Sequence, residues 1–284
     1  MPAPCDGLRL QLRKVLSDED KNPADADRII MKHTGLDKGA LLNSTYIVTD
    51  EQFNAIECDI AARLSGRPLQ YILGEWEFYS LPFIVGEGVL VPRPETELLV
   101  DFALDFLRDK ESPVVYDLCS GSGCIAAAVG KNRPNARVFA LEWSEAALGY
   151  LTENIKLNST ANVSVLKADV LAGPSFTNLP APDLILSNPP YIPSADMAHL
   201  MDEVLCEPEM ALLGGADGLD FYRALATLWL PCLQTGGGAA FEVGLGQADD
   251  VGNLVSQAGY DFAFIHDLSG IERVVTATKS DIKD

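Results

Sequence analysis

Val114-Val115-Tyr116-Asp117-Leu118 is a mainly apolar run, and Cys119-Ser120-Gly121-Ser122-Gly123 follows it directly. The run is typical of a buried strand, and a helix is expected to begin at Cys124. In a doubly wound α/β sheet, the first ligand loop lies between such a strand and such a helix. Glycines in that loop let the main chain approach a ligand closely. The stretch 114–123 therefore predicts an α/β fold with a binding loop after its first strand.

Strand and helix signals alternate beyond this stretch, and such alternation implies a parallel sheet with helices on both faces. The chain then closes with two strand-like runs joined by a short turn, which indicates an antiparallel hairpin. The expected elements are strands at 137–142, 163–169, 183–187 and 238–243, helices from 124 and at 144–157, 219–233 and 247–258, and the hairpin strands 262–268 and 273–278. The fold class expected is α/β, with a Rossmann-like sheet and a C-terminal antiparallel hairpin.

The first part of the chain lacks strand signals. Apolar residues recur there at three- and four-residue spacing over residues 8–64, which predicts several short helices. An aromatic and β-branched region with turn residues follows. We expect a small helical domain at 1–73, a β-hairpin linker at 74–92 and an α/β domain at 93–284.

The charge balance bears on the class of partner. Asp and Glu total 41 against 21 Lys and Arg, so the net charge is −20. Such a charge opposes tight binding to phosphate backbones. A nucleic-acid substrate is therefore disfavoured, and no direct nucleic-acid contact is expected. A basic protein that itself binds RNA would be an electrostatically suitable partner.

Other features of the composition bear on metals and membranes. The six cysteines have no CxxC spacing and only three histidines are present, so neither a metal site nor a disulfide framework is expected. No segment approaches the ~18 consecutive apolar residues of a membrane span. The first residues show no secretory signal pattern. We expect a cytoplasmic protein without membrane contact, and a monomer.

The glycine loop and the strand after it indicate a cofactor that contains a nucleoside. Glu142 ends the second expected strand, about twenty residues after the loop, where a carboxylate can accept both ribose hydroxyls. The pattern Gly121-x-Gly123-x-x-Ala126 also fits a dinucleotide fingerprint. An acid at position 117, aimed at the ligand, would repel pyrophosphate but favour a cationic sulfonium. S-adenosylmethionine is therefore the better fit. Asp169 could meet the adenine amino group, and a plain surface turn is the other interpretation of this residue.

Asn188-Pro189-Pro190-Tyr191 should lie at the carboxyl end of the expected strand 183–187. Two consecutive prolines cannot donate main-chain hydrogen bonds, so the segment is stiff and presents bare carbonyls. The Asn188 side-chain oxygen beside a proline carbonyl gives two acceptors, which suit a planar NH2 group. A simple turn after a strand is the other interpretation of this segment.

The same motif suggests how a methyl group could be transferred. An amide or aromatic amine is a poor nucleophile, and two acceptors would hold its lone pair toward the methyl donor. Parallel strands gather their carboxyl ends at one edge, so Asn188 would face the cofactor there. Asn188, Pro189 and Tyr191 are the candidate catalytic residues, with the Tyr191 ring packed on the planar acceptor. Pro190 joins them in the candidate substrate site.

A second segment also presents a directed side chain. Arg93 stands between Pro92 and Pro94 on a stiff, extended main chain, which favours a specific contact and makes it a candidate substrate-binding residue. A solvated linker arginine is the other interpretation. The helix expected at 98–107 follows, with Thr96 as its most plausible cap.

Together these motifs resemble those of the release-factor glutamine methyltransferases, also called the HemK/PrmC family. The Pro-Arg-Pro-Glu-Thr-Glu block is the more specific mark, because DNA adenine methyltransferases share Asn-Pro-Pro-Tyr. The resemblance spans most of the chain and is carried by Arg67–Ile72, Gly74–Phe78, Val91–Glu97, Asp117–Gly123, Asn188–Tyr191, and Asp267–Gly270 followed by Arg273.

The resemblance implies a class I methyltransferase domain that uses S-adenosylmethionine and a helical domain that helps to recognise the protein substrate. The acceptor would be the glutamine of the Gly-Gly-Gln motif in class I peptide-chain release factors, methylated at N5. The loop 119–123 and Glu142 would bind the cofactor, Val170 would flank the adenine, and the segment 188–191 would hold the glutamine. Two residues depart from the usual pattern: Cys119 replaces the first glycine of the loop, and Glu142 stands where aspartate is common.

Two other functions fit parts of the pattern. An adenine-N6 methyltransferase acting on DNA or RNA would share Asn188–Tyr191, but it predicts a basic groove that the net charge of −20 argues against. A non-enzymatic binding protein with a vestigial cofactor pocket would account for Cys119. Binding of S-adenosylmethionine separates the last reading from the first two.

Overall fold

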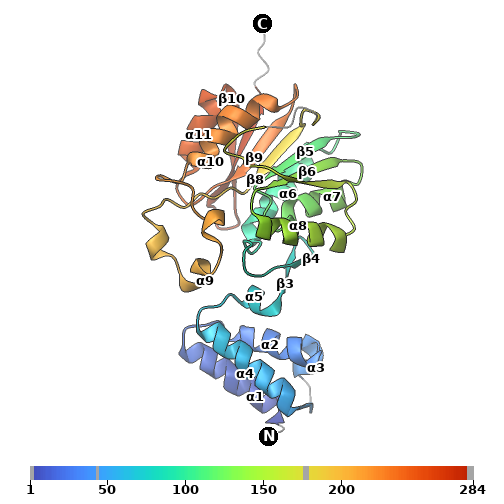
Figure 1. Ribbon diagram of the computed structural model, residues 1–284, viewed down its shortest axis with the longest axis vertical. Helices are drawn as coiled ribbons and strands as arrows, with labels where there is room; N and C mark the ends of the chain where they lie inside the picture. The colour runs from blue at the N-terminus through green and yellow to red at the C-terminus, as the bar shows by residue number, and fades with distance from the viewer. Residues whose placement is uncertain (1–2, 43–44, 175–178, 280–284) are drawn as a thin grey trace. The chain divides into compact units, whose positions relative to one another are not determined.

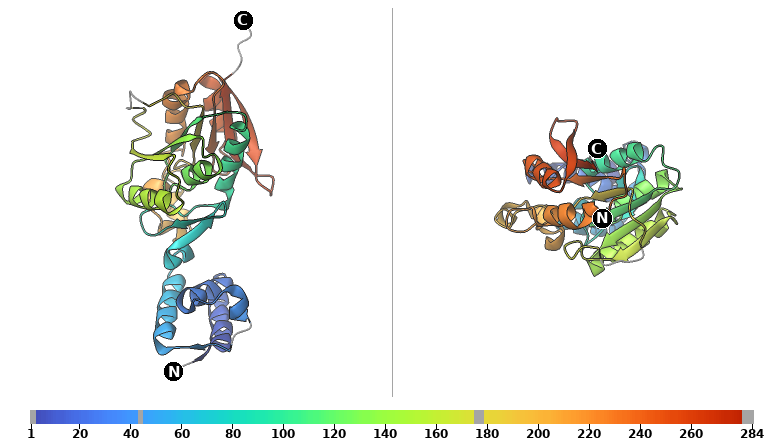
Figure 2. Two further views of the ribbon diagram at one scale, coloured as in Figure 1. Left: turned by 90° about the vertical axis from the view of Figure 1, so that its right-hand side faces the viewer. Right: turned by 90° about the horizontal axis from the view of Figure 1, so that it is seen from above.

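The chain divides into a helical unit and an α/β unit (Figures 1 and 2). The computed structural model describes residues 3–42, 45–174 and 179–279. The helical unit comprises residues up to Glu75 together with the distant segment Met201–Cys206, and the α/β unit comprises the rest. The sequence suggested no connection between that segment and the helices, and this is the main difference from the expected domain boundaries.

Apolar stripes on successive helices form the core of the helical unit. Leu12 and Leu16 of α1, Ile29 of α2 and Ile56 and Ile60 of α4 are buried at the expected spacing. The N-terminus of α4 carries a capping box between Thr49 and Gln52. The elements are β1 (Ala3–Pro4), α1 (Cys5–Asp18), α2 (Ala24–Thr34), α3 (Lys38–Leu42), β2 (Ile47–Val48), α4 (Asp50–Leu64), α5 (Leu69–Leu73) and α9 (Asp202–Leu205).

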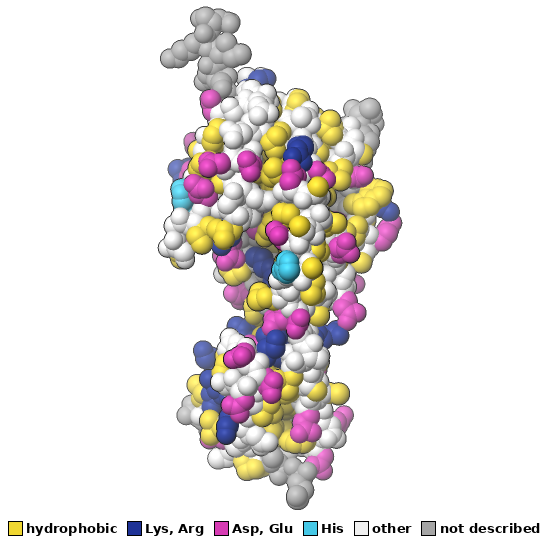
Figure 3. Space-filling model, turned by 90° about the vertical axis from the view of Figure 1, so that its left-hand side faces the viewer, with side chains coloured by type: hydrophobic (Ala, Val, Ile, Leu, Met, Phe, Trp, Pro, Cys, Tyr) yellow, Lys and Arg dark blue, Asp and Glu magenta, His cyan; other side chains and the backbone are white. Residues whose placement is uncertain are grey.

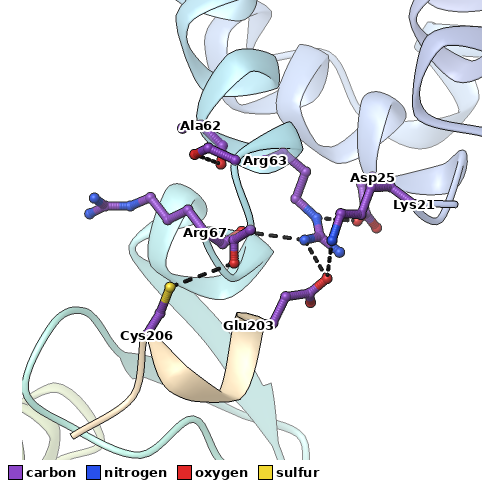
Figure 4. A network of polar contacts seen from close by, with 9 residues as sticks. Lys21, Asp25, Ala62, Arg63, Arg67, Glu203 and Cys206 are labelled. Atoms are coloured by element: carbon purple, nitrogen blue, oxygen red, sulfur yellow. Dashed lines mark hydrogen bonds and ion pairs between the residues drawn. The ribbon is translucent and has the colours of Figure 1, made fainter. Parts of the chain in front are cut away.

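Arg63 holds the segment Met201–Cys206 within the helical unit (Figure 4). Its Nε lies 2.7 Å from Asp25 Oδ2, and its Nη1 lies 2.7 Å from Glu203 Oε1. Lys21 Nζ reaches the same Glu203 oxygen at 3.1 Å. Burial opposes ionisation of Glu203, but Arg63 and Lys21 hold its pKa below the usual value. Glu203 therefore stays a carboxylate that joins α9 to α4.

The α/β unit is built on a seven-stranded sheet with the order β10-β11-β9-β8-β5-β6-β7. The five strands from β9 to β7 are parallel, and β11 is antiparallel to both of its neighbours. This confirms the expected Rossmann-like sheet with a C-terminal antiparallel hairpin. The sheet strands are β5 (Val114–Leu118), β6 (Arg137–Glu142), β7 (Val163–Lys167), β8 (Leu184–Ser187), β9 (Gly238–Glu242), β10 (Tyr260–His266) and β11 (Glu272–Lys279).

Helices cover both faces of this sheet, and each face has its own apolar core. Leu99 of α6 and Leu151 of α8 belong to one core, and Trp229 and Val251 belong to the other. The other elements of the unit are β3 (Glu75–Phe78), β4 (Leu81–Ile84), α6 (Glu97–Phe106), α7 (Cys124–Asn132), α8 (Glu145–Leu157), α10 (Asp220–Ala224), α11 (Ala248–Gln257), a π-helical turn (Leu225–Trp229), and 3-10 turns at Pro94–Thr96, Met197–His199, Glu209–Ala211 and Leu230–Cys232.

The hairpin linker forms as expected, whereas the helix expected at 219–233 is irregular. The hairpin after Gly74 forms from β3 and β4, with Tyr79 and Ser80 at positive φ in the two-residue turn. The helix expected at 219–233 is instead a succession of α-, π- and 3-10-helical turns, and Pro231 lies in the last of them because it cannot continue an α-helix. Across the described ranges, no helix has the length and apolarity needed to cross a membrane.

Candidate active site

A cavity of about 530 Å³ lies where the parallel strands of the α/β unit end. Residues from the loops after β5, β6, β7 and β8 line it, as expected for the carboxyl edge of such a sheet. The lining includes Gly88, Leu90, Cys119, Gly121, Glu142, Trp143, Ala168, Asp169, Val170, Leu171, Asn188, Pro190, Glu209 and Phe221. The sheet thus brings the glycine loop, Glu142, Asp169 and Asn188 together.

A smaller cavity adjoins this one. Leu90, Cys119, Gly121 and Asn188 line both cavities. The small cavity is also lined by Pro92, Arg93, Thr96, Ser120, Ser122, Cys124 and Ile125. The Pro-Arg-Pro segment therefore reaches the same site as the glycine loop. The remaining candidates Asp117, Gly123, Pro189 and Tyr191 line neither cavity.

The glycine loop makes a tight turn between β5 and α7. Cys119 has φ 60°, Gly121 has φ 54° and Gly123 has φ 80°, all in the left-handed region. A Cβ on Gly123 would lie 2.2 Å from Leu151 Cδ1, whereas one on Gly121 would meet no heavy atom within 4 Å. Gly123 is thus required for packing, and Gly121 leaves open space on the cavity side. Cys119 occupies a left-handed conformation that suits glycine and is strained for a residue with a side chain.

Glu142 lies beside this loop at the end of β6. Its Oε2 accepts a hydrogen bond from Gly121 N at 2.8 Å, and its Oε1 accepts from Trp143 N and Ser144 N, both at 2.8 Å. A carboxylate has about four lone-pair sites, so the residue retains capacity for ribose hydroxyls. The extra methylene relative to aspartate lets the carboxylate turn back to the loop main chain.

Asp117 lines neither cavity, so its contact with the cofactor stays a prediction. The residue is fully buried, and its Oδ2 accepts a hydrogen bond from Ala126 N at 3.1 Å in the first turn of α7. Gly123, the cap residue of α7, has no side chain that could do this, so Asp117 supplies the capping oxygen. Burial raises the pKa of Asp117 to about 7. Its Oδ2 joins the strand to the helix beneath the loop, whereas its buried Oδ1 has no hydrogen-bond partner.

The adenine side of the cavity is expected after β7. Asp169 and Val170 both line the cavity, and Asp169 Oδ1 accepts a hydrogen bond from Leu171 N at 2.9 Å. Val170 is buried, and its carbonyl accepts a hydrogen bond from Trp229 Nε1 at 2.9 Å. The strand ends at Lys167 rather than at Asp169, which leaves both residues in the loop.

The Asn-Pro-Pro-Tyr segment begins directly after β8. Ser187 Oγ donates to Leu118 O at 2.7 Å, which ties this strand end to the end of β5, directly before the glycine loop. Asn188 is half-buried and its Nδ2 donates to Thr96 Oγ1 at 3.2 Å. Pro189 and Pro190 are buried. Asn188 thus lies in both cavities on a rigid main chain.

Three glycines without side chains allow the protein to pack closely around Tyr191. A Cβ on Gly214, Gly218 or Gly244 would lie 2.7 Å from Tyr191 Cα, 2.3 Å from its carbonyl oxygen or 2.9 Å from its ring, respectively. Gln247 Nε2 donates to the Tyr191 carbonyl at 2.9 Å. Burial raises the pKa of the Tyr191 hydroxyl. Gly214 and Gly218, which lie four residues apart in the sequence, were not among the residues predicted to form the site.

Arg93 is held by a buried partner. Its Nη2 lies 2.7 Å from Glu207 Oε1, and the Glu207 side chain is 2% exposed. Burial raises the pKa of Glu207, and Arg93 opposes that rise. This ion pair overturns the reading of Arg93 as a solvated linker residue. Contact with the substrate stays a prediction.

The cavity residues fit a nucleoside cofactor that carries positive charge. Glu142, Asp169 and Glu209 line the larger cavity, and none of the described residues that line it is Lys or Arg. Such a lining would repel pyrophosphate and suits a sulfonium ion. The acidic lining, which does not include Asp117, therefore favours S-adenosylmethionine over a dinucleotide. Among the described residues, no cluster of His, Cys, Asp and Glu could hold a metal ion.

Comparison with known proteins agrees with this site. Residues 8–74 match the model of the PrmC N-terminal domain, and residues 96–215 match that of the methyltransferase small domain. A release factor glutamine methyltransferase from Thermodesulfovibrio yellowstonii is 38% identical over 95% of this chain and 97% of its own. One from Gloeobacter violaceus is 38% identical over 97% of each chain.

A solved structure shares the fold at lower identity. The hMettl16 catalytic domain, in complex with an MAT2A 3′UTR hairpin, aligns with a TM-score of 0.59 at 14% identity and covers 79% of this chain and 83% of its own. This likeness concerns the fold alone. Identity over nearly the whole length is decisive, and the chain belongs to the release factor glutamine methyltransferase family.

Proposed function

We propose that this protein transfers a methyl group from S-adenosylmethionine to the side-chain amide nitrogen, N5, of the glutamine in the Gly-Gly-Gln motif of class I peptide-chain release factors. The observation that carries the proposal is the position of Asn188, which lies at the end of β8 in both cavities beside the glycine loop. The relatives that match over nearly the full length are release factor glutamine methyltransferases. The activity would take place in the cytoplasm, where release factors meet the ribosome.

Positioning of the acceptor is the main task of these residues. An amide nitrogen is a poor nucleophile because its lone pair is delocalised into the carbonyl. Two acceptors, Asn188 Oδ1 and the main-chain carbonyl of Pro189, would take the two NH2 hydrogens and turn the lone pair toward the methyl group. The same acceptors would stabilise positive charge that develops on nitrogen. The Tyr191 ring would pack on the planar amide, and Pro190 would complete the pocket wall.

The cofactor side of the cavity would be formed by the loops after β5, β6 and β7. S-adenosylmethionine would supply an electrophilic methyl group on its sulfonium sulfur. The open space at Gly121 lets the main chain of residues 119–123 approach the cofactor closely. Glu142 would accept the ribose hydroxyls, and Asp169 and Val170 would border the adenine.

The helical unit is proposed to help recognise the release factor, and the protein is proposed to act as a monomer without direct contact to nucleic acid. Acidic side chains are spread over the face drawn in Figure 3, together with basic ones. The net charge of −20 favours a basic protein partner over a phosphate backbone.

The decisive experiment incubates the protein with isotope-labelled S-adenosylmethionine and a purified class I release factor, followed by mass spectrometry of the peptides. We expect one added methyl group on the Gly-Gly-Gln glutamine. A release factor with alanine in place of that glutamine is the matched control and should stay unlabelled. Label on the control peptide, or transfer only to an adenine-containing oligonucleotide offered in parallel, would refute the proposal.

A further inference from the structure

Three side chains from separate elements meet behind the Asn-Pro-Pro-Tyr segment. Asn188 follows β8, Thr96 precedes α6 and Glu242 ends β9. Asn188 Nδ2 donates a hydrogen bond to Thr96 Oγ1 at 3.2 Å. Ser187 pairs with Phe241 across β8 and β9, so Glu242 at the end of its strand lies beside Asn188, and Thr96 lowers the pKa of the Glu242 carboxyl. Thr96 is 2% exposed and Glu242 is 4% exposed, so water is largely excluded from this chain of contacts.

The Thr96 hydroxyl is available for these contacts because it does not cap α6. Thr96 has helical dihedral angles, φ −64° and ψ −19°, and its side chain makes no capping hydrogen bond. This corrects the expectation that Thr96 caps the helix. A buried hydroxyl needs partners. Asn188 is one partner, and the neighbouring Glu242 carboxylate is the acceptor that could take the hydroxyl proton.

The chemistry of the three groups determines which of them donates and which accepts in each hydrogen bond. An ionised carboxylate can only accept, so in a hydrogen bond with Thr96 the Glu242 carboxylate would take the single hydroxyl proton. The Thr96 oxygen can then only accept from Asn188, which must present its NH2 group to Thr96. The Asn188 side-chain amide has an NH2 group on one side and a carbonyl oxygen on the other. With the nitrogen committed to Thr96, Oδ1 remains for the substrate.

We infer that Thr96 and Glu242 are positioning residues that set which way the Asn188 amide faces, and thereby make it an acceptor for the substrate NH2 group. The inference rests on the proposed function, because only an NH2 substrate requires the oxygen of Asn188. With the amide reversed, an NH2 group would face the substrate NH2 and donor would oppose donor. Neither Thr96 nor Glu242 needs to touch the substrate.

The ionisation of Glu242 makes the direction of the hydrogen bonds at Thr96 dependent on pH. Arg93 and Glu95 face it from the segment before α6, Arg273 from β11, Tyr191 from the loop after β8, Tyr222 from α10 and Cys124 from α7. Burial raises the pKa of Glu242 to about 7. A protonated carboxyl can donate to Thr96, which frees the hydroxyl proton to point at Asn188. Turnover should therefore rise as the pH rises through the pKa of Glu242.

Two substitutions at position 96 separate this role from packing. Thr96→Val keeps the volume of the side chain but removes the hydroxyl, whereas Thr96→Ser keeps the hydroxyl but removes a buried methyl group. We expect Thr96→Val to lower kcat about tenfold to a hundredfold, with the Kd for S-adenosylmethionine within about threefold of wild type. Thr96→Ser should retain most of kcat. The opposite order, in which Ser is impaired and Val is normal, would show that only packing matters and overturn the inference.

Glu242→Gln gives a second test that does not depend on position 96. Single-turnover transfer to the release factor would be measured from pH 6 to pH 9 for wild type and variant, with cofactor binding by calorimetry as the check on folding. We expect the rise near pH 7 in wild type and its loss in Glu242→Gln. The same rise in both proteins would overturn the inference. Absence of any transfer by the wild-type enzyme would instead refute the proposed function, so the two failures are distinguishable.

Discussion

Gly121 N donates a hydrogen bond of 2.8 Å to Glu142 Oε2, so the residue proposed to bind the ribose also fixes the glycine loop. Glu142→Gln removes the charge at unchanged length. Hydrogen bonds to charged groups contribute about 1.5–3 kcal/mol, so we expect the Kd for S-adenosylmethionine to rise by roughly tenfold or more. Isothermal titration calorimetry measures this. Glu145→Gln is the matched control, because Glu145 is 77% exposed and does not line the cavity; an equal loss in both variants would argue against a ribose contact.

Cys119 at φ 60° provides a test of strain in the same loop. A left-handed conformation costs a residue with a side chain roughly 1–2 kcal/mol, which glycine avoids. Glycine also makes the unfolded chain more flexible, which offsets up to about 1 kcal/mol of this relief. Cys119→Gly should therefore raise the free energy of unfolding by about 0.5–1 kcal/mol in urea titrations. Cys119→Ala keeps Cβ and should give no such gain. Equal effects of the two substitutions would assign the change to loss of the sulfur.

Asn188→Ala should separate turnover from cofactor binding. The variant loses the oxygen proposed to hold the substrate NH2 group, so we expect kcat to fall by about a hundredfold or more. The Kd for S-adenosylmethionine should stay within about threefold, because the cofactor contacts lie on the loops after β5, β6 and β7. Rates come from transfer of labelled methyl groups and affinities from calorimetry. A large loss of affinity would reassign Asn188 to the cofactor.

Glu242 should make stability depend on pH in a defined direction. Its pKa is raised by burial from 4.5 to about 7 in the folded protein. At this residue the folded state therefore binds more protons than the unfolded state between these values, so the contribution of Glu242 to stability is largest below pH 4.5 and falls as the pH rises to 7. Glu242→Gln should reduce the fall between pH 5 and pH 8 by about 2–3 kcal/mol, measured by urea denaturation. Asp117 contributes a fall of the same sign that remains in the variant. An unchanged pH profile would contradict ionisation of Glu242 in this range.

The two partners of Arg63 should differ in their effect on stability. The Asp25 side chain is 7% exposed, and the Glu203 side chain is 35% exposed. Arg63→Met leaves a buried carboxylate without its partner, which costs about 3–5 kcal/mol. Glu203→Gln breaks a partly exposed pair and should cost about 1 kcal/mol or less. Thermal unfolding followed by circular dichroism would measure both. Equal losses would mean that the contact with Asp25 is not the one that matters.

The sequence predicts the sheet and its ligand loops because these depend on local patterns. Apolar runs gave the strands β5, β6 and β8 closely, and the glycine loop and Glu142 follow from their distance to a strand end. Parallel strands must gather their carboxyl ends at one edge, so the meeting of Asn188 with this loop was also predictable.

The missed parts depend on contacts between distant segments. Thr96 and Asn188 are 92 residues apart, and nothing in either local pattern links them. The hydrogen bond between Asp117 and Ala126 was not predicted, because the need for a capping oxygen appears only once Gly123 is known to be the cap residue of α7. The irregular end of the helix expected at 219–233 follows from Pro231, which the sequence prediction did not take into account.

The packing of Met201–Cys206 with the first 75 residues has a consequence for protein engineering. A fragment that ends at Glu75 would leave Arg63 and Lys21 without the carboxylate of Glu203. A chimera that grafts the helices of one relative onto the sheet of another would pair them with a foreign α9. Transplanting this unit therefore requires two pieces of sequence, in which the charges of Glu203, Arg63 and Lys21 are matched.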